Sequence, residues 1–215
     1  MSRMKPPFDQ PCYGVKEELT LEDYREMQRM EADYYTEEHI TPAEEAARWR
    51  SHNPWAGVVL TCGHDIVGFI DVLPVGETVF NQIAAGTLND REMTTDHFLS
   101  EERLFQQGGE AKNLFFSCAV VRRDYRGTDA LTHLLKAYLD QLHTLLERGV
   151  VFRKVAGDCV TEEGERFSRK IGLSYRCESD HGTRIYTGSF SDFLERLRTL
   201  IGEETLPLSG KQPHY

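Results

Sequence analysis

The chain has 215 residues, of which 40% are hydrophobic and 28% charged, as expected of a soluble α/β protein with one compact domain. Its formal net charge of −10, without a basic cluster, argues against a nucleic-acid partner. No apolar run approaches the ~18 residues that cross a bilayer, and the first residues do not resemble a secretory signal, so we expect a cytoplasmic protein without membrane contact.

The first elements in chain order are a short strand and a helix. Residues 12–16 form a candidate strand, and Thr20 is expected to cap the following helix, with Asp23 closing a capping box. A stripe of large side chains at helical spacing favours core packing over a ligand site. The stripe consists of Tyr24, Met27, Met30 and Tyr34.

A second helix and a hairpin follow. Thr41 is expected to cap the helix, with Pro42 at the first helical position, where its missing N–H costs nothing. Residues 55–62 and 66–73 are rich in Val, Ile and Phe and predict the two strands of a hairpin.

Residues 74–109 lose this regular pattern, apart from a short helix predicted at 79–85. A connection of this length in a compact domain is either a binding lid or flexible surface.

The second half predicts four strands and three helices in a regular order. The strands cover residues 113–121, 150–159, 173–178 and 184–189. The helices run from Leu131 to Gly149, over 162–171, and from a cap at Ser191 to Gly202. A parallel crossover through the Leu-rich helix makes the sheet mixed. We expect one domain over 12–203, with tails at 1–11 and 204–215.

The turn after the apolar strand 113–121 is the first candidate site. A tight turn that enters a helix leaves backbone N–H groups free to bind a phosphate, and Arg122, Arg123 and Arg126 add positive charge. Any strand–helix turn shares part of this geometry, so the turn alone leaves anion binding open.

Two segments resemble a known family. Residues 121–131 read Val-Arg-Arg-Asp-Tyr-Arg-Gly-Thr-Asp-Ala-Leu, similar to the acetyl-CoA motif of the GNAT (Gcn5-related N-acetyltransferase) superfamily, Val-x-x-x-Tyr-Arg-Gly-x-Gly-x-Gly. Residues 161–173 resemble the later family pattern Asn-x-x-Ala-x-x-Leu-Tyr-x-Lys-x-Gly-Phe in register. The resemblance implies a GNAT fold, an α/β (α+β) protein with a mixed central sheet flanked by helices on both faces.

The resemblance also implies a function: transfer of an acetyl or other short acyl group from acyl-CoA to a primary amine by direct attack in a ternary complex. The alternative is a GNAT-fold protein that binds acyl-CoA for regulation with little catalysis. The final strands of this fold often pair between subunits, which would give a homodimer. The acceptor, a small molecule or a peptide amine, is left open; the acidic charge either favours a cationic or neutral acceptor or only maintains solubility.

The family pattern assigns co-substrate contacts to the end of the strand, to the turn and to one residue of the later motif. These residues are Ala119, Val120, Val121, Arg126, Gly127, Thr128, Asp129, Ala130 and Thr161. Asp129 and Leu131 depart from the pattern, because both stand where the family has small residues. The Asp129 carboxylate opposes phosphate binding unless it points aside to cap the helix, and Leu131 is expected in the core.

Catalysis requires a base, because an alkyl amine has a pKa near ~10 and arrives protonated. Asp158 is the first candidate base, since its strand parity is opposite to that of Val155 and Gly157; capping the next helix or facing solvent is the alternative. Ser168 stands where the family has a tyrosine that protonates the leaving thiolate. Tyr175 and Tyr186 are substitutes, or else packed aromatic residues.

Asp71, Ser117 and His181 are weaker catalytic candidates. Five scattered cysteines without a CxxC pair indicate reduced, packed thiols, and the eight histidines lack metal-binding spacing, so we expect no metal.

Overall fold

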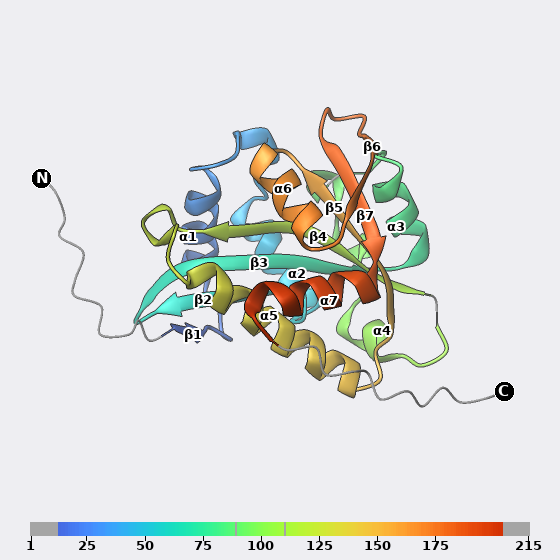
Figure 1. Cartoon of the computed structure of the whole chain (residues 1–215), viewed down its shortest axis with the longest axis horizontal. Helices are drawn as coiled ribbons and strands as arrows, with labels where there is room; N and C mark the ends of the chain where they lie inside the picture. Colours follow the sequence, from blue (N-terminus) through green and yellow to red (C-terminus); the bar gives the residue numbers. More distant parts are fainter. Residues whose placement is uncertain (1–12, 89, 110, 204–215) are drawn as a thin grey trace, which may run out of the picture.

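The computed structural model describes residues 13–88, 90–109 and 111–203 (Figure 1). Within these residues the strands are β1 Tyr13–Val15, β2 Gly57–Cys62, β3 Asp65–Val75, β4 Lys112–Val121, β5 Phe152–Cys159, β6 Ser174–Glu178 and β7 Arg184–Ser189. The helices are α1 Leu21–Glu31, α2 Ala43–His52, α3 Glu77–Ala84, α4 Glu101–Phe105, α5 Ala130–Glu147, α6 Glu162–Lys170 and α7 Phe190–Ile201. The expected tails and Cys12 lie outside the described residues.

The strands form one mixed sheet in the order β1-β2-β3-β4-β5-β7-β6. Neighbouring strands are antiparallel except β4 and β5, which are parallel and joined through α5. This crossover was predicted from the sequence. It places the carboxyl ends of β4 and β5 at the same edge, where ligands commonly bind in α/β sheets.

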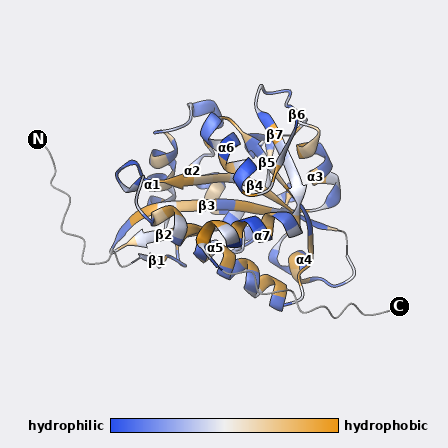
Figure 2. Ribbon diagram, viewed as in Figure 1, coloured by the Kyte–Doolittle hydropathy of each residue, from blue (hydrophilic) through white to orange (hydrophobic). Residues whose placement is uncertain are grey.

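Helices cover both faces of the sheet, as the motif resemblance implied. On one face α5 and α7 bury Leu134, Leu139 and Phe193 against the strands, and on the other α1 buries Tyr24 and Met27. Figure 2 shows the hydrophobic residues concentrated along β3 and β4 and on parts of α5. Apolar residues on both faces of the central strands explain their almost continuous hydrophobic sequence.

The predicted N-cap residue is correct for α1 and wrong for α2 and α7. Thr20 caps α1, with the reciprocal capping box to Asp23. Helix α2 begins after Pro42, whose carbonyl accepts the first helical hydrogen bonds, so Thr41 lies outside the cap. The hydroxyl of Ser189, rather than that of Ser191, accepts a hydrogen bond from the N–H of Asp192 and caps α7.

The described residues of the stretch 74–109 contribute several side chains to the core. It contains α3, as predicted, and then short helical turns that bury Phe98, Leu99 and Leu104, and Phe98 forms a β-bridge with Val75. Since these side chains are fully covered, most of the stretch is neither a flexible surface nor a lid. Residues 90 and 91 reach the cavity described below.

Candidate active site

The candidate site begins where β4 and β5 separate. Their last paired residues are Phe116 and Gly157, while β4 continues to Val121 bonded only to β3. The β3–β4 register shifts at this point, which leaves Ser117 unpaired as a β-bulge. Bulges re-aim side chains and end pairing, and they are frequent next to active sites. The separation exposes one backbone edge of β4 to a groove.

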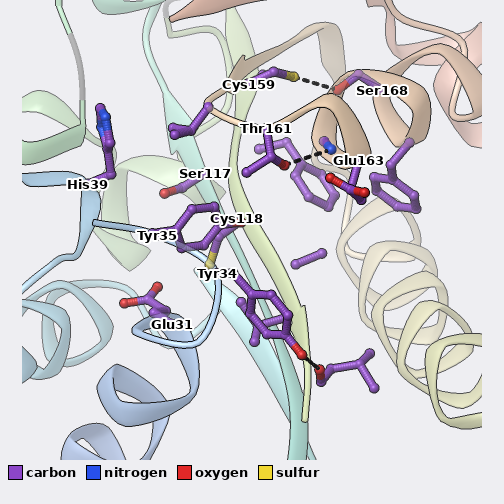
Figure 3. Close-up of a pocket in the computed structure, with 18 of the residues that line it drawn as sticks. Glu31, Tyr34, Tyr35, His39, Ser117, Cys118, Cys159, Thr161, Glu163 and Ser168 are labelled. Carbon is purple, nitrogen blue, oxygen red and sulfur yellow. Dashed lines mark hydrogen bonds between the residues drawn. The ribbon is translucent and has the colours of Figure 1, made fainter. Parts of the chain in front are cut away.

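A cavity of about 630 Å³ follows this groove (Figure 3). One end lies at the turn between β4 and α5, which we call the cradle and define as residues 126–132. The other end, which we call the chamber, lies between the sheet and the segment after α1. The chamber walls are Glu31, Tyr35, His39, Asp90, Ser117, Cys118, Asp158, His181 and Thr183.

The cradle has the features of an anion site. Among the described residues, the backbone N–H groups of Gly127, Asp129, Leu131 and Thr132 have no hydrogen-bond partner, and they stand at the N-terminus of α5. Gly127 has a φ of 77°, and a Cβ there would meet no atom within 4 Å. Free amides at the start of an 18-residue helix, beside the open space at Gly127, are typical of an anion site.

The Asp129 carboxylate is turned away from this cradle. It accepts a hydrogen bond of 3.0 Å from the Tyr13 hydroxyl and lies 3.4 Å from Nε2 of His133. It makes no capping hydrogen bond to α5, and Asp129 and Ala130 are not among the cavity-lining residues. The N–H of Ala130 instead donates to the Thr128 hydroxyl. The Asp129 carboxylate, which departs from the family pattern, therefore does not project into the cavity.

If the cradle binds the diphosphate of coenzyme A, as the motif resemblance implies, Tyr13→Phe is expected to weaken that binding ~2- to 5-fold, because Asp129 loses its donor and its charge can swing toward the cradle. Calorimetric titration with coenzyme A measures the affinity, and the loss should shrink at high salt. Adding Asp129→Asn to Tyr13→Phe should restore the affinity. An affinity that Tyr13→Phe leaves unchanged would contradict this role.

Leu131 lies on the cavity wall with 38% of its surface exposed, so the expectation that it packs in the core is wrong. The strand residues Ala119, Val120 and Val121 line the groove, as do Arg126, Gly127 and Thr128. Thr161 also lines it, while its hydroxyl accepts a 3.1 Å hydrogen bond from Gly164 and caps α6.

Asp158 lies on the chamber wall, one residue beyond the last β4–β5 pair. Asp158 therefore lies on the chamber side of the sheet, as its strand parity opposite to Val155 and Gly157 predicted. Its Oδ1 is buried without a hydrogen-bond partner in the described chain. An unpaired buried carboxylate oxygen in a cavity is costly unless a ligand supplies the missing donor.

Of the other predicted catalytic residues, Ser168 lines the cavity with Asp158, whereas Tyr175 and Tyr186 do not. Ser168 lines the cavity, with its hydroxyl 3.1 Å from the Cys159 thiol. Tyr175 lies outside the cavity and is 55% exposed, because β6 is an edge strand. Tyr186 is buried, and its hydroxyl donates to Glu165 at 2.7 Å. Neither tyrosine is therefore placed to act on a ligand in the cavity.

Burial raises the pKa of every carboxyl group in and behind the chamber. It raises the pKa of Glu31 from 4.5 to about 8, with further contributions from Asp71 and Asp90. Burial also raises the pKa of Asp158 and of Asp90. Asp71, behind Cys118, has a raised pKa for the same reason, although Arg50 opposes the shift from 3.2 Å.

The sequence analysis missed several residues of the site. Glu31, Tyr35 and His39 come from α1 and the segment after it, and Figure 3 shows them opposite Ser117 and Cys118 of β4. A fourth missed residue is Tyr34, which the sequence analysis assigned to the helical stripe but which lies beyond the end of α1. Its hydroxyl donates to the carbonyl of Val121 at 3.0 Å.

Arg126 stacks on this tyrosine. Its guanidinium lies 4.3 Å from the centre of the Tyr34 ring, and both side chains line the cavity. Glu31 had a usable signal, because it stands seven residues after Tyr24 and four after Met27, which places a carboxylate on the buried stripe.

No three histidine, cysteine or acidic side chains of the described chain are grouped to hold a metal ion. None of its described helices has the length and hydrophobicity to span a bilayer.

No protein-family model matches the sequence, and no curated protein matches it. Solved structures do match. The loading GNATL domain of CurA from Lyngbya majuscula is 14% identical with a TM-score of 0.58, covering 83% of this chain and 98% of that one. The GphF GNAT-like decarboxylase in complex with isobutyryl-CoA is 15% identical with a TM-score of 0.53, covering 82% and 98%. Mosquito arylalkylamine N-acetyltransferase like 5b is 15% identical with a TM-score of 0.50, covering 83% and 100%. The chain therefore has the GNAT fold that the two motifs predicted.

Proposed function

We propose that this GNAT-fold chain is an acyl-CoA-dependent N-acyltransferase that moves a short acyl group, in the first instance acetyl, to a primary amine by direct attack in a ternary complex. The observation that carries the proposal is one continuous cavity joining a free-amide cradle to a carboxylate-lined chamber. The structural neighbours support an acyl-CoA ligand, since one of them holds isobutyryl-CoA. Another is an arylalkylamine N-acetyltransferase-like protein, which agrees with an amine acceptor.

In this proposal the cradle amides and Arg126 hold the diphosphate of the co-substrate. The exposed backbone edge of β4, at Ala119 and Val120, pairs with the pantetheine arm. Bound in this way, the co-substrate supplies an activated thioester carbonyl near the point where β4 and β5 separate.

Asp158 is the proposed base. It lies at that point with an unpartnered Oδ1, and it removes a proton from the incoming ammonium so that the nitrogen lone pair can attack. The new C–N bond forms as the C–S bond breaks, the electron pair leaves on the thiolate of coenzyme A, and the second proton lost by the nitrogen passes to that thiolate, giving the amide and the free thiol. Ser168 is the hydroxyl on the cavity wall at the position of the family's tyrosine. A thiol of pKa ~8.5 is a tolerable leaving group, so a weak donor is sufficient.

The chamber favours an amine over an acyl group that bears its own carboxylate. Three carboxylates face the cavity there, and a further anion would be repelled. This argues against decarboxylation of a dicarboxylic acyl-CoA, although one neighbour is named a decarboxylase.

A thermal-shift titration with acetyl-CoA tests the co-substrate. A ligand that binds only the folded state at 100 times its Kd stabilises it by about 2.7 kcal/mol, so the melting temperature should rise by several degrees. Release of free thiol with a panel of primary amines then tests transfer. A melting shift without thiol release would favour the alternative of a regulatory acyl-CoA-binding protein, and no shift at millimolar acetyl-CoA would contradict both.

A further inference from the structure

The cavity is divided by charge. Arg123, Arg126 and Lys170 line the cavity outside the chamber, and none of them is in an ion pair with another described residue; Arg166 and Glu163 also line it and pair with each other at 2.8 Å. The chamber end carries Glu31, Asp90 and Asp158 instead. The positive end suits the phosphates of a co-substrate. The negative end suits a ligand whose positive charge balances the chamber carboxylates.

The three chamber carboxylates have no protein cation. No lysine or arginine in the described parts of the chain forms an ion pair with Glu31, Asp90 or Asp158. Asp71, close behind them, differs in having such a partner, because a guanidinium nitrogen of Arg50 lies 3.2 Å from its Oδ1.

The cations nearest the chamber compensate for this charge only in part: His39 lowers the pKa of Asp90 and Asp158, and His181 lowers that of Asp158, without an ion pair to either. Arg91 follows Asp90 in the chain and lines the cavity, but it is exposed and unpaired with the three carboxylates. His39 and His181 face the chamber, and each approaches a carboxylate outside it, Glu38 at 3.8 Å and Glu92 at 3.4 Å.

Glu31 is the most telling of the three residues. Only 9% of its surface is exposed, it lines the cavity, and no nitrogen or oxygen donor among the described residues bonds to its carboxylate. The Cys118 thiol, a weak donor, lowers the pKa of Glu31, but its hydrogen bond goes to Oδ2 of Asp71 at 3.8 Å. Asp90 is the best supplied, because it accepts a hydrogen bond from Ser117 at 3.0 Å and others from nearby backbone N–H groups. Asp158 is hydrogen-bonded to Thr183, but its Oδ1 is buried without a partner in the described chain. The unpartnered carboxylate oxygens of Glu31 and Asp158, on the walls of a cavity, indicate that a ligand supplies the missing donors.

One ammonium group cannot satisfy all of these oxygens. The carboxylates come from α1, from the turn at residues 90–92 and from β5, and no three acidic, histidine or cysteine side chains of the described chain are grouped closely enough to hold one metal ion. An ammonium beside Asp158, at the mouth of the β4–β5 separation, is placed to react. Glu31 and Asp90 then remain without a counter-charge.

We infer that the acceptor carries a second positive charge, as an aliphatic diamine or polyamine does, and that Glu31 together with Asp90 binds the distal ammonium while the reacting amine lies beside Asp158. The assignment of the reacting amine rests on the proposed function. The recognition of a dication rests only on the chamber.

Binding and turnover are measured separately to test this inference. Calorimetric titration of the full chain, with coenzyme A present, compares diaminobutane and diaminohexane with butylamine and hexylamine, and with the ω-amino acid γ-aminobutyrate. The better diamine should bind ~10- to 100-fold more tightly than the monoamine of equal length, the effect of one charge-assisted hydrogen-bonded contact. The amino acid should bind no better than the monoamine.

Glu31→Gln keeps the shape of the side chain and should reduce diamine affinity to the monoamine level. Glu26→Gln is the matched control, because it removes the same charge from the solvent side of the same helix, where Glu26 pairs with Arg29; it should leave the preference intact. Equal binding of diamines and monoamines, or a diamine preference that survives Glu31→Gln, overturns the inference.

Turnover separates the two proposals. Acetylation of monoamines and diamines at equal kcat/KM would overturn the inference and leave the transferase in place. A Glu31-dependent preference in binding without acetylation of any amine would support the dication site and contradict the transferase.

Discussion

Asp158→Asn is expected to lower kcat for amine acetylation by ~10²- to 10⁴-fold, the range measured for loss of a positioned general base. Asparagine has nearly the same shape but cannot accept the proton that the ammonium must lose. The carboxylate lies on the chamber wall beside the last β4–β5 pair, with one oxygen unpartnered. Steady-state release of free thiol measures the change.

The affinity for coenzyme A should be unaffected by this substitution. The cradle amides that are proposed to hold the diphosphate lie at the other end of the cavity from Asp158. Asp180→Asn is the control, because Asp180 is exposed and does not line the cavity. Unchanged kcat in Asp158→Asn would remove this residue as the base. A fall in coenzyme A affinity of similar size would indicate a structural effect instead.

The fold could be predicted from the sequence where local pattern and tertiary packing agree. The β4–α5–β5 unit is one example, since an apolar strand, a Leu-rich helix and a second strand bury the same faces that their periodicity indicated. Cap positions were less certain, because Ser189 and Ser191 are equivalent at the sequence level. Which serine caps α7 depends on where β7 ends. Because the pairing of β7 with β5 ends at Ser189, this residue is the cap.

The candidate site could be predicted only in part. The cradle is a local structure, so its turn and helix start were readable from residues 121–131. The chamber is built by distant segments, and Asp90 enters it from a stretch without a pattern. Asp129 illustrates the same limit, since its carboxylate is held aside by Tyr13, which lies 116 positions away in the chain. No spacing rule brings such residues together before the sheet is assembled.

Glu31→Gln is expected to stabilise the folded chain at alkaline pH and to have much less effect at acid pH. Burial and the charges of Asp71 and Asp90 raise the pKa of Glu31 from 4.5 to about 8 in the folded state, while Cys118 opposes the shift. A raised folded-state pKa means that the wild-type chain loses stability as the pH rises from about 4.5 through about 8. A shift of this size corresponds to about 5 kcal/mol once it is fully developed.

Urea unfolding of wild type and Glu31→Gln at pH 5 and pH 9 measures this difference, and the gap in unfolding free energy should open with rising pH. Asp71, Asp90 and Asp158 also have raised pKa values and destabilise both proteins in the same direction, so the difference isolates Glu31. Glu26→Gln should show no comparable pH-dependent gap. Because a bound dication would neutralise the same carboxylate, a saturating diamine should close the gap by stabilising wild type more than Glu31→Gln. A gap that is equal at both pH values would mean that Glu31 is solvated in the folded chain and that the chamber does not hold a buried charge at this position.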